Sequence, residues 1–114
     1  MEDIKISSGS MINILFNSVS FKNCNFKNIV CIGESDNSSL IRFQSCDYGN
    51  TLNIKDVTIN KCFSNGDLIT IEGNNSSIIM SNLIINNVSS YGSIINDLSL
   101  KVCLIIYLLS LFNQ

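Results

Sequence analysis

The stretch Leu52–Ser64, with the sequence LNIKDVTINKCFS, alternates apolar and polar residues in two short runs, which the polar pairs Lys55-Asp56 and Asn60-Lys61 separate. Its apolar positions are Leu52, Ile54, Val57, Ile59 and Cys62. A period of two predicts β-strands, because successive side chains of a strand point to opposite faces. An amphipathic helix would instead repeat its apolar residues at intervals of three and four. The stretch therefore predicts very short strands joined at sharp corners.

Two further stretches repeat this pattern, one before and one after it. Their apolar residues are Ile14, Phe16, Val19, Phe21 and Cys24 in the first copy, and Ile78, Met80, Leu83, Ile85 and Val88 in the last. A second apolar element follows each copy, at Leu40–Phe43, Leu68–Ile71 and Ser93–Asn96. The interval from Val57 to Leu83 is also the interval from Leu68 to Ile94, whereas the first two copies lie further apart. We assign the extra residues to a surface loop at Asn28–Asn37 and to Gln44–Asn50.

Repeats of this length predict an all-β fold, a parallel β-helix (solenoid) of about three coils. One repeat cannot bury its own apolar side, whereas stacked repeats enclose a shared interior. In the second element, the expected columns of stacked residues are Ile41/Ile69/Ile95 facing inward and Arg42/Thr70/Asn96 facing outward. We expect coils near residues 12–43, 50–71 and 76–97, within a β-helix of residues 1–97. Asp3–Ile6 is expected to be the second element of an earlier, truncated coil.

The corners between strands carry residues that tolerate a left-handed backbone. The expected corner columns are Ser18/Asp56/Asn82 and Asn23/Lys61/Asn87. Asn adopts the left-handed conformation more readily than most residues, and its amide can bond its own backbone or the residue stacked above. The abundance of Asn therefore has a structural explanation, and glycan binding by these amides is the alternative.

Charge and composition exclude several classes of protein. Six Lys and one Arg are scattered along the chain and offset by nine acidic residues, so no basic face for nucleic acid forms. Abundant Ile and Leu with a net charge of −2 argue against disorder. The N-terminus begins with acidic residues and has an interrupted apolar run, so we predict no signal peptide within it.

The cysteines are Cys24, Cys31, Cys46, Cys62 and Cys103, an odd number without CxxC spacing in a chain that has no His. This pattern predicts no zinc site. Cys24 and Cys62 are expected to share one column as small buried apolar groups. A disulfide between adjacent coils is the alternative, since neighbouring strands lie about 4.8 Å apart.

The C-terminal segment of residues 98–114 is far more apolar than the rest. A further coil would place apolar residues at positions 104, 106, 109 and 111, which Leu104, Ile106, Leu109 and Leu111 occupy. A terminal coil or helical cap is the first interpretation, and a hydrophobic anchor remnant or a gene-model artefact are the others. The run is too short for a stable membrane span, which needs about 20 residues. Three coils with open ends are marginally stable, so we expect the chain to be part of a longer solenoid.

Residues that could carry catalysis are dispersed. The acids Glu34, Asp47, Asp56, Asp67, Glu72 and Asp97 do not stack beside one another in the repeat, and Arg42 is the only Arg. Glycoside cleavage needs paired carboxylates, and calcium loops need a fixed spacing of acids that is missing here. We therefore predict no enzyme activity and no catalytic, cofactor-binding or metal-binding residue.

The repeated unit L-x-I-x-[D/N]-[V/L]-x-I-x-[N/K]-[C/V]-x-S, followed by a Gly turn and L-I-x-I, spans residues 12–97. It resembles the right-handed parallel β-helices of the pectin-lyase-like superfamily. Its Asn-, Ser- and Ile-rich texture is similar to the non-catalytic repeats of anaerobic gut fungi, which include scaffoldins of the cellulosome. The resemblance implies no catalytic residue, because the superfamily's catalytic signatures have no counterpart here.

That resemblance implies a non-catalytic structural and protein-interaction scaffold, extracellular or at the cell surface. Its expected partners are proteins such as dockerin-bearing enzymes, further β-helix coils and glycans, but not nucleic acid. The alternatives are a fragment of a carbohydrate-binding or carbohydrate-cleaving β-helix, and a surface adhesin.

Overall fold

The computed structural model describes the chain except residues 8, 34–37, 98–100, 107–108 and 113–114. The described residues form an all-β parallel solenoid of about three turns without a helix, which confirms the predicted fold class. Its extents are 35 × 30 × 20 Å. In this part of the chain, nothing helical is long and apolar enough to cross a membrane.

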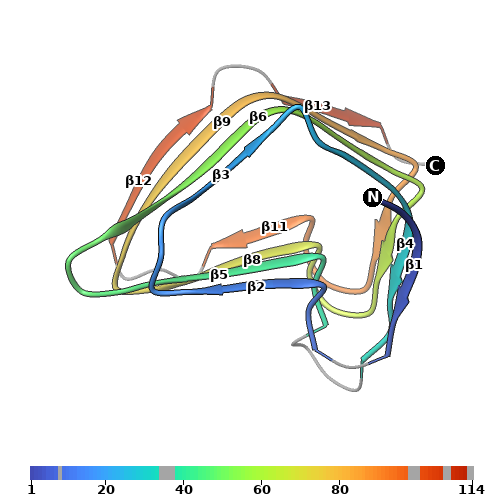
Figure 1. Ribbon diagram of the computed structural model, residues 1–114, viewed down its shortest axis with the longest axis horizontal. Coiled ribbons are helices and arrows are strands. Elements are labelled where there is room, and N and C mark those ends of the chain that lie inside the picture. The colour runs from blue at the N-terminus through green and yellow to red at the C-terminus, as the bar shows by residue number, and fades with distance from the viewer. Residues whose placement is uncertain (8, 34–37, 98–100, 107–108, 113–114) are drawn as a thin grey trace.

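The strands follow one another around the solenoid, and Figure 1 shows successive turns stacked along one axis. In chain order they are β1 (Glu2–Ile6), β2 (Ile12–Leu15), β3 (Val19–Lys22), β4 (Asn25–Cys31), β5 (Ile41–Ser45), β6 (Asn50–Asn60), β7 (Phe63–Ser64), β8 (Ile69–Gly73), β9 (Asn75–Asn86), β10 (Ser89–Ser90), β11 (Ile95–Asp97), β12 (Lys101–Ile106) and β13 (Leu109–Phe112). All strand pairs among the described residues are parallel. Sheet B contains β2, β5, β8 and β11, and sheet A contains the others.

The stacking predicted for the second and third copies is confirmed. β6 pairs with β9 so that Leu52 lies beside Ile78 and Val57 beside Leu83. These four side chains are fully buried, as the alternating pattern requires when one strand face turns inward. In sheet B, the column Ile41/Ile69/Ile95 also has the predicted register. The core is therefore a tube of stacked Ile, Leu, Val, Met and Phe side chains.

The predicted alignment of the first copy is wrong by one short strand. Val19, not Ile14, pairs with Leu52, and Phe26 pairs with Ile59. Ile14 lies in sheet B, beside Phe43. Along the first turn, similar apolar pairs recur at a constant short interval, so a shift by one strand leaves the sequence pattern unchanged. That internal repeat explains the misalignment.

The predicted loop at Asn28–Asn37 begins too early. Residues Asn28–Cys31 belong to β4, and Ile29 and Cys31 are fully buried. Cys31 pairs with Ser64 and Ile41 pairs with Ile69. The chain takes twice as many positions from Cys31 to Ile41 as from Ser64 to Ile69, so the insertion lies between the first two residues. Residues 34–37 of the predicted loop lie outside the described part of the chain.

The two ends of the chain extend the stack. β1 pairs with β4, with Ile4 beside Ile29, so Asp3–Ile6 does belong to an earlier turn but not to its second element. β12 and β13 both pair with β9 at the register of a further turn, with Leu104 beside Ile78 and Leu109 beside Leu83. The backbone over these strands is that of a coil and not of a helical cap.

Each turn bends where one residue adopts a left-handed backbone. Positive φ angles of 54–56° occur at Asp3, Asn23, Asn28, Asp56, Lys61, Asn82 and Asn87. Asp56, Lys61, Asn82 and Asn87 are thus corner residues, as predicted. Ser18 is not a corner residue, and its Oγ accepts a hydrogen bond from the Thr51 N–H. Asn23 lies beside Asp56 instead, since the preceding residue Lys22 pairs with Lys55. Short polar side chains predominate here because they tolerate this conformation.

The cysteines do not stack as predicted. Cys24 lies beside Val57, as the hydrogen bond from the Thr58 N–H to the Cys24 carbonyl indicates. Cys62 precedes Phe63, which pairs with Val30, so it lies beside Ile29. Cys24, Cys31, Cys46 and Cys62 are free thiols. The column shared by Cys24 and Cys62 is therefore wrong.

Candidate interaction surface

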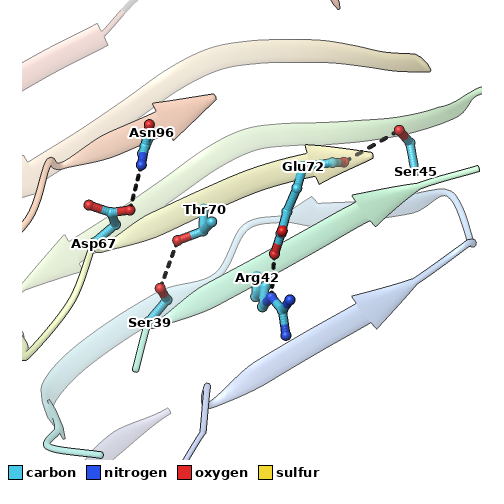
Figure 2. A network of polar contacts seen from close by, with 7 residues as sticks. All are labelled: Ser39, Arg42, Ser45, Asp67, Thr70, Glu72 and Asn96. Atoms are coloured by element: carbon cyan, nitrogen blue, oxygen red, sulfur yellow. Dashed lines mark hydrogen bonds and ion pairs between the residues drawn. The ribbon is translucent and has the colours of Figure 1, made fainter. Parts of the chain in front are cut away.

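The outer face of sheet B gathers polar side chains from successive turns (Figure 2). Arg42, Thr70 and Asn96 lie in one column, at the register predicted for them. The expectation that all three face solvent needs correction at Thr70, which is only 7% exposed. Its Oγ1 shares a 2.8 Å hydrogen bond with Ser39 Oγ of the preceding turn, and this bond offsets the desolvation cost of burying the hydroxyl.

An ion pair links two neighbouring turns of this face. Nε of Arg42 contacts Oε1 of Glu72, and both side chains are 27% exposed. Glu72 pairs in register with Gln44, so the ion pair runs diagonally between adjacent columns. The sequence did not predict this contact, because the repeat aligns residues only within a column and this pair joins two columns. The pair neutralises the only Arg of the chain.

Asp67 fixes the turn above it. Its Oδ1 accepts a 2.7 Å hydrogen bond from the Ser93 N–H, and its Oδ2 accepts a 2.8 Å bond from Asn96 Nδ2. Both carboxylate oxygens are therefore occupied by one neighbouring turn. The contacts make this acid a structural link between turns.

A hollow of about 480 Å³ opens where sheet B ends and the chain turns toward β6 and β9. We call it the corner hollow; its lining residues are Phe16, Gln44, Ser45, Cys46, Asp47, Gly73 and Asn74. Gly73 has a φ of +108°, and a Cβ there would come within 2.3 Å of the Ser45 carbonyl oxygen. Glycine at this position thus allows two turns to approach closely along one wall.

Phe16 is the aromatic wall of the corner hollow. It was predicted to lie inside the solenoid, stacked on Ile54, and this is wrong. Its N–H donates to the Gln44 carbonyl at the end of sheet B, where its backbone adopts a φ of +58° and its side chain is 55% exposed. A left-handed φ is uncommon for a bulky side chain, and here it follows the end of β2 and leaves the aromatic ring at the surface.

The polar wall comes from two adjacent turns. Asn74 Nδ2 donates to Asp47 Oδ1, and the Cys46 N–H donates to Asn50 Oδ1 over 2.8 Å. Asp47 is exposed, and the side-chain amide of Asn74 bonds one oxygen of its carboxylate. No sequence pattern indicated the site, since its residues come from separate turns and one of them was misaligned.

The acids considered as catalytic candidates remain apart. Asp47 bonds Asn74, Glu72 bonds Arg42 and Asp67 bonds Asn96. Glu34 lies outside the described residues. Within the described ranges, no group of three or more His, Cys, Asp or Glu side chains is placed to hold a metal ion.

Comparison of the chain with protein-family models, with curated proteins and with solved structures finds no match.

Proposed function

We propose that this chain is a non-catalytic structural and protein-interaction scaffold, a segment of a secreted or cell-surface β-helix protein. One observation carries the proposal: successive turns of the solenoid hold equivalent positions in fixed register, as at Arg42, Thr70 and Asn96, of which Arg42 and Asn96 are partly exposed. Neighbouring strands lie about 4.8 Å apart, so such a stack presents its side chains at regular intervals.

The outward polar groups are held before any partner arrives. The pairs Arg42–Glu72 and Asp67–Asn96 each join two turns. A surface whose side chains are already fixed loses less conformational entropy on binding than a mobile one. Such rigidity suits a display platform.

The likeness to scaffoldin-type, pectin-lyase-like repeats gives the proposal its partner class. Dockerin-bearing enzymes are the proteins that such scaffolds display, and further β-helix coils are partners for the free strand edges. Among the described strands, the edge strand β2 pairs with β5 alone, and its inward Ile12 and Ile14 are half-buried whereas Ile41 and Phe43 above them are fully buried. Added strands at such an edge would complete the burial.

Surface plasmon resonance with the immobilised 114-residue chain and a panel of dockerin-bearing enzymes tests the proposal. We expect saturable binding that Arg42→Glu weakens, because this change reverses the charge on the outer face of sheet B. Lys22→Glu is the matched control, because it makes the same charge reversal at an exposed position of β3 in sheet A. Release of reducing ends from polygalacturonate by the purified chain, or no binding by any member of the panel, would contradict the proposal.

A further inference from the structure

We propose that the corner hollow binds a guanidinium group, such as the side chain of an Arg presented by a partner protein. The partner's being a protein rests on the proposed function, whereas the chemistry of the hollow does not. The inference depends on three features of the lining: an exposed aromatic ring, an accessible carboxylate and a rigid wall.

The aromatic ring is that of Phe16. More than half of its side chain is exposed, yet it lines a concave site and does not project freely into solvent. A cation that lies over an aromatic face is attracted by the quadrupole of the ring, and Arg occupies such positions more often than Lys. The planar guanidinium also stacks on the ring.

The lining has a carboxylate and no cation to neutralise it. Asp47 is the acid, and the six other residues of the lining carry no positive charge at neutral pH. The hydrogen bond from Asn74 engages Oδ1 of Asp47, which leaves Oδ2 for an incoming donor. Gln44 and Asn74 add side-chain carbonyl acceptors. A group with several N–H donors and a positive charge satisfies these acceptors.

The wall behind them is fixed by contacts between turns. Ser45 Oγ accepts a 3.1 Å hydrogen bond from the Asn75 N–H and a 2.9 Å bond from Ser76 Oγ. Gly73 packs against Ser45 so closely that no side chain fits between them. A preorganised site of this kind loses little entropy when it binds a small group.

Nuclear magnetic resonance titration of the ¹⁵N-labelled chain with N-acetyl-arginine amide tests the inference. The isosteric N-acetyl-citrulline amide, which lacks the charge, is the matched probe. We expect the arginine probe to bind in the millimolar range and to shift the amide signals of Cys46, Asp47 and Asn74. The citrulline probe should bind at least about threefold more weakly, because the ion pair and the cation–π contact are lost.

Variants locate the site. Phe16→Ala and Asp47→Asn should each weaken arginine binding at least about threefold, since each removes one of the two attractions. Tyr48→Ala is the control, because Tyr48 is 98% exposed in the same turn but does not line the hollow. Well-dispersed spectra of both variants establish that they fold.

Three results would overturn the inference: equal binding of both probes, retention of binding by Asp47→Asn, or shifts at the hollow caused by cellobiose and not by arginine. The last result would instead favour a saccharide site. Loss of the arginine site alone leaves the scaffold proposal standing, provided that Phe16→Ala still binds the dockerin-bearing enzymes. The proposed function fails separately if the wild-type chain does not bind the dockerin-bearing enzymes.

Discussion

Asn82 donates a 2.9 Å hydrogen bond from its side-chain amide to Oδ1 of Asp56, and both residues have a left-handed backbone at the same corner of successive turns. One turn thus uses a residue type that tolerates the bend, and that residue also bonds the turn below it. Asn28 bonds Asp3 in the same way over 3.0 Å at the next corner. Corner chemistry and stacking are therefore coupled through the same side chains.

Replacement of Asn82 by Ala should lower the free energy of unfolding by about 2–3 kcal/mol, from two effects. The bond to Asp56 contributes about 1 kcal/mol, and a Cβ-bearing residue without a local polar contact costs about 1–2 kcal/mol in the left-handed region. Asn82→Gly should cost less, because Gly adopts this backbone freely. Urea denaturation measures both, with Asn53→Ala in the straight part of β6 as control. An equal loss in the Ala and Gly variants would contradict the role of the backbone.

The register of the first turn is testable by double-mutant cycles. Val19 lies beside Leu52, whereas Ile14 lies in sheet B. Leu52→Ala should cost about 2–5 kcal/mol because Leu52 is fully buried, and it should couple with Val19→Ala by more than about 0.5 kcal/mol. The cycle with Ile14→Ala should show a smaller coupling energy. A larger coupling for Ile14 would restore the register predicted from sequence.

The fold was predictable from sequence where the repeat is unambiguous. No insertion lies between Val57 and Leu83, so apolar alternation alone was enough to pair them. In the first turn, the apolar pairs at Val19/Phe21 and Cys24/Phe26 are equivalent in pattern, and only the length of the insertion after Cys31 distinguishes them. Pattern reasoning cannot measure an insertion whose own residues have no period, so the alignment slipped by one strand.

Gly73→Ala should be among the most destabilising single changes in the chain. The new Cβ would meet the Ser45 backbone at 2.3–2.5 Å, at a φ of +108° that residues with a Cβ rarely adopt. We expect a loss of more than about 2 kcal/mol in the free energy of unfolding. Gly9→Ala is the control, because Gly9 has a φ of +69° but nothing within 4 Å of the added Cβ. A difference between the two variants of less than about 0.5 kcal/mol would contradict the close approach of the turns.

The corner hollow could not be predicted because it depends on three turns at once. Phe16 comes from the first turn, Asp47 from the second and Asn74 from the third. The sequence pattern made Phe16 an interior residue, since an apolar residue two positions after Ile14 fits strand alternation. The left-handed backbone at Phe16 ends the strand and reverses that orientation, although the residue at the bend is neither Gly nor Asn.

The ion pair between Arg42 and Glu72 should contribute little to stability. Both side chains are partly exposed, and such pairs contribute about 0–1 kcal/mol. A double-mutant cycle with Arg42→Gln and Glu72→Gln should therefore give a coupling energy below about 1 kcal/mol, which added salt reduces further. A coupling energy above about 2 kcal/mol would contradict this expectation and would mean that the ion pair makes a large contribution to the stability of sheet B.

The free energy of unfolding should depend on pH in the alkaline range because two thiols are buried, those of Cys31 and Cys62. Burial raises the pKa of the Cys31 thiol and of the Cys62 thiol above the ordinary value of about 9.0. Both thiols therefore stay protonated in the folded chain at a pH where the unfolded chain has begun to release these protons. Their contribution to stability is complete below pH 9 and is lost as the pH rises above it, by at most about 1.4 kcal/mol per pH unit for each thiol.

Urea denaturation under reducing conditions between pH 7 and pH 10.5 measures this loss. The double variant Cys31→Ala with Cys62→Ala should lose less stability over the alkaline part of the range, because it lacks both thiols with a raised pKa. Alkylation by iodoacetamide at pH 8 gives an independent readout, since only the thiolate reacts. Half-buried Cys24 and Cys46 should react faster than Cys31 and Cys62. Parallel pH curves for the wild-type chain and the double variant, with equal alkylation of Cys24, Cys31, Cys46 and Cys62, would show that the interior of the solenoid admits water at these positions.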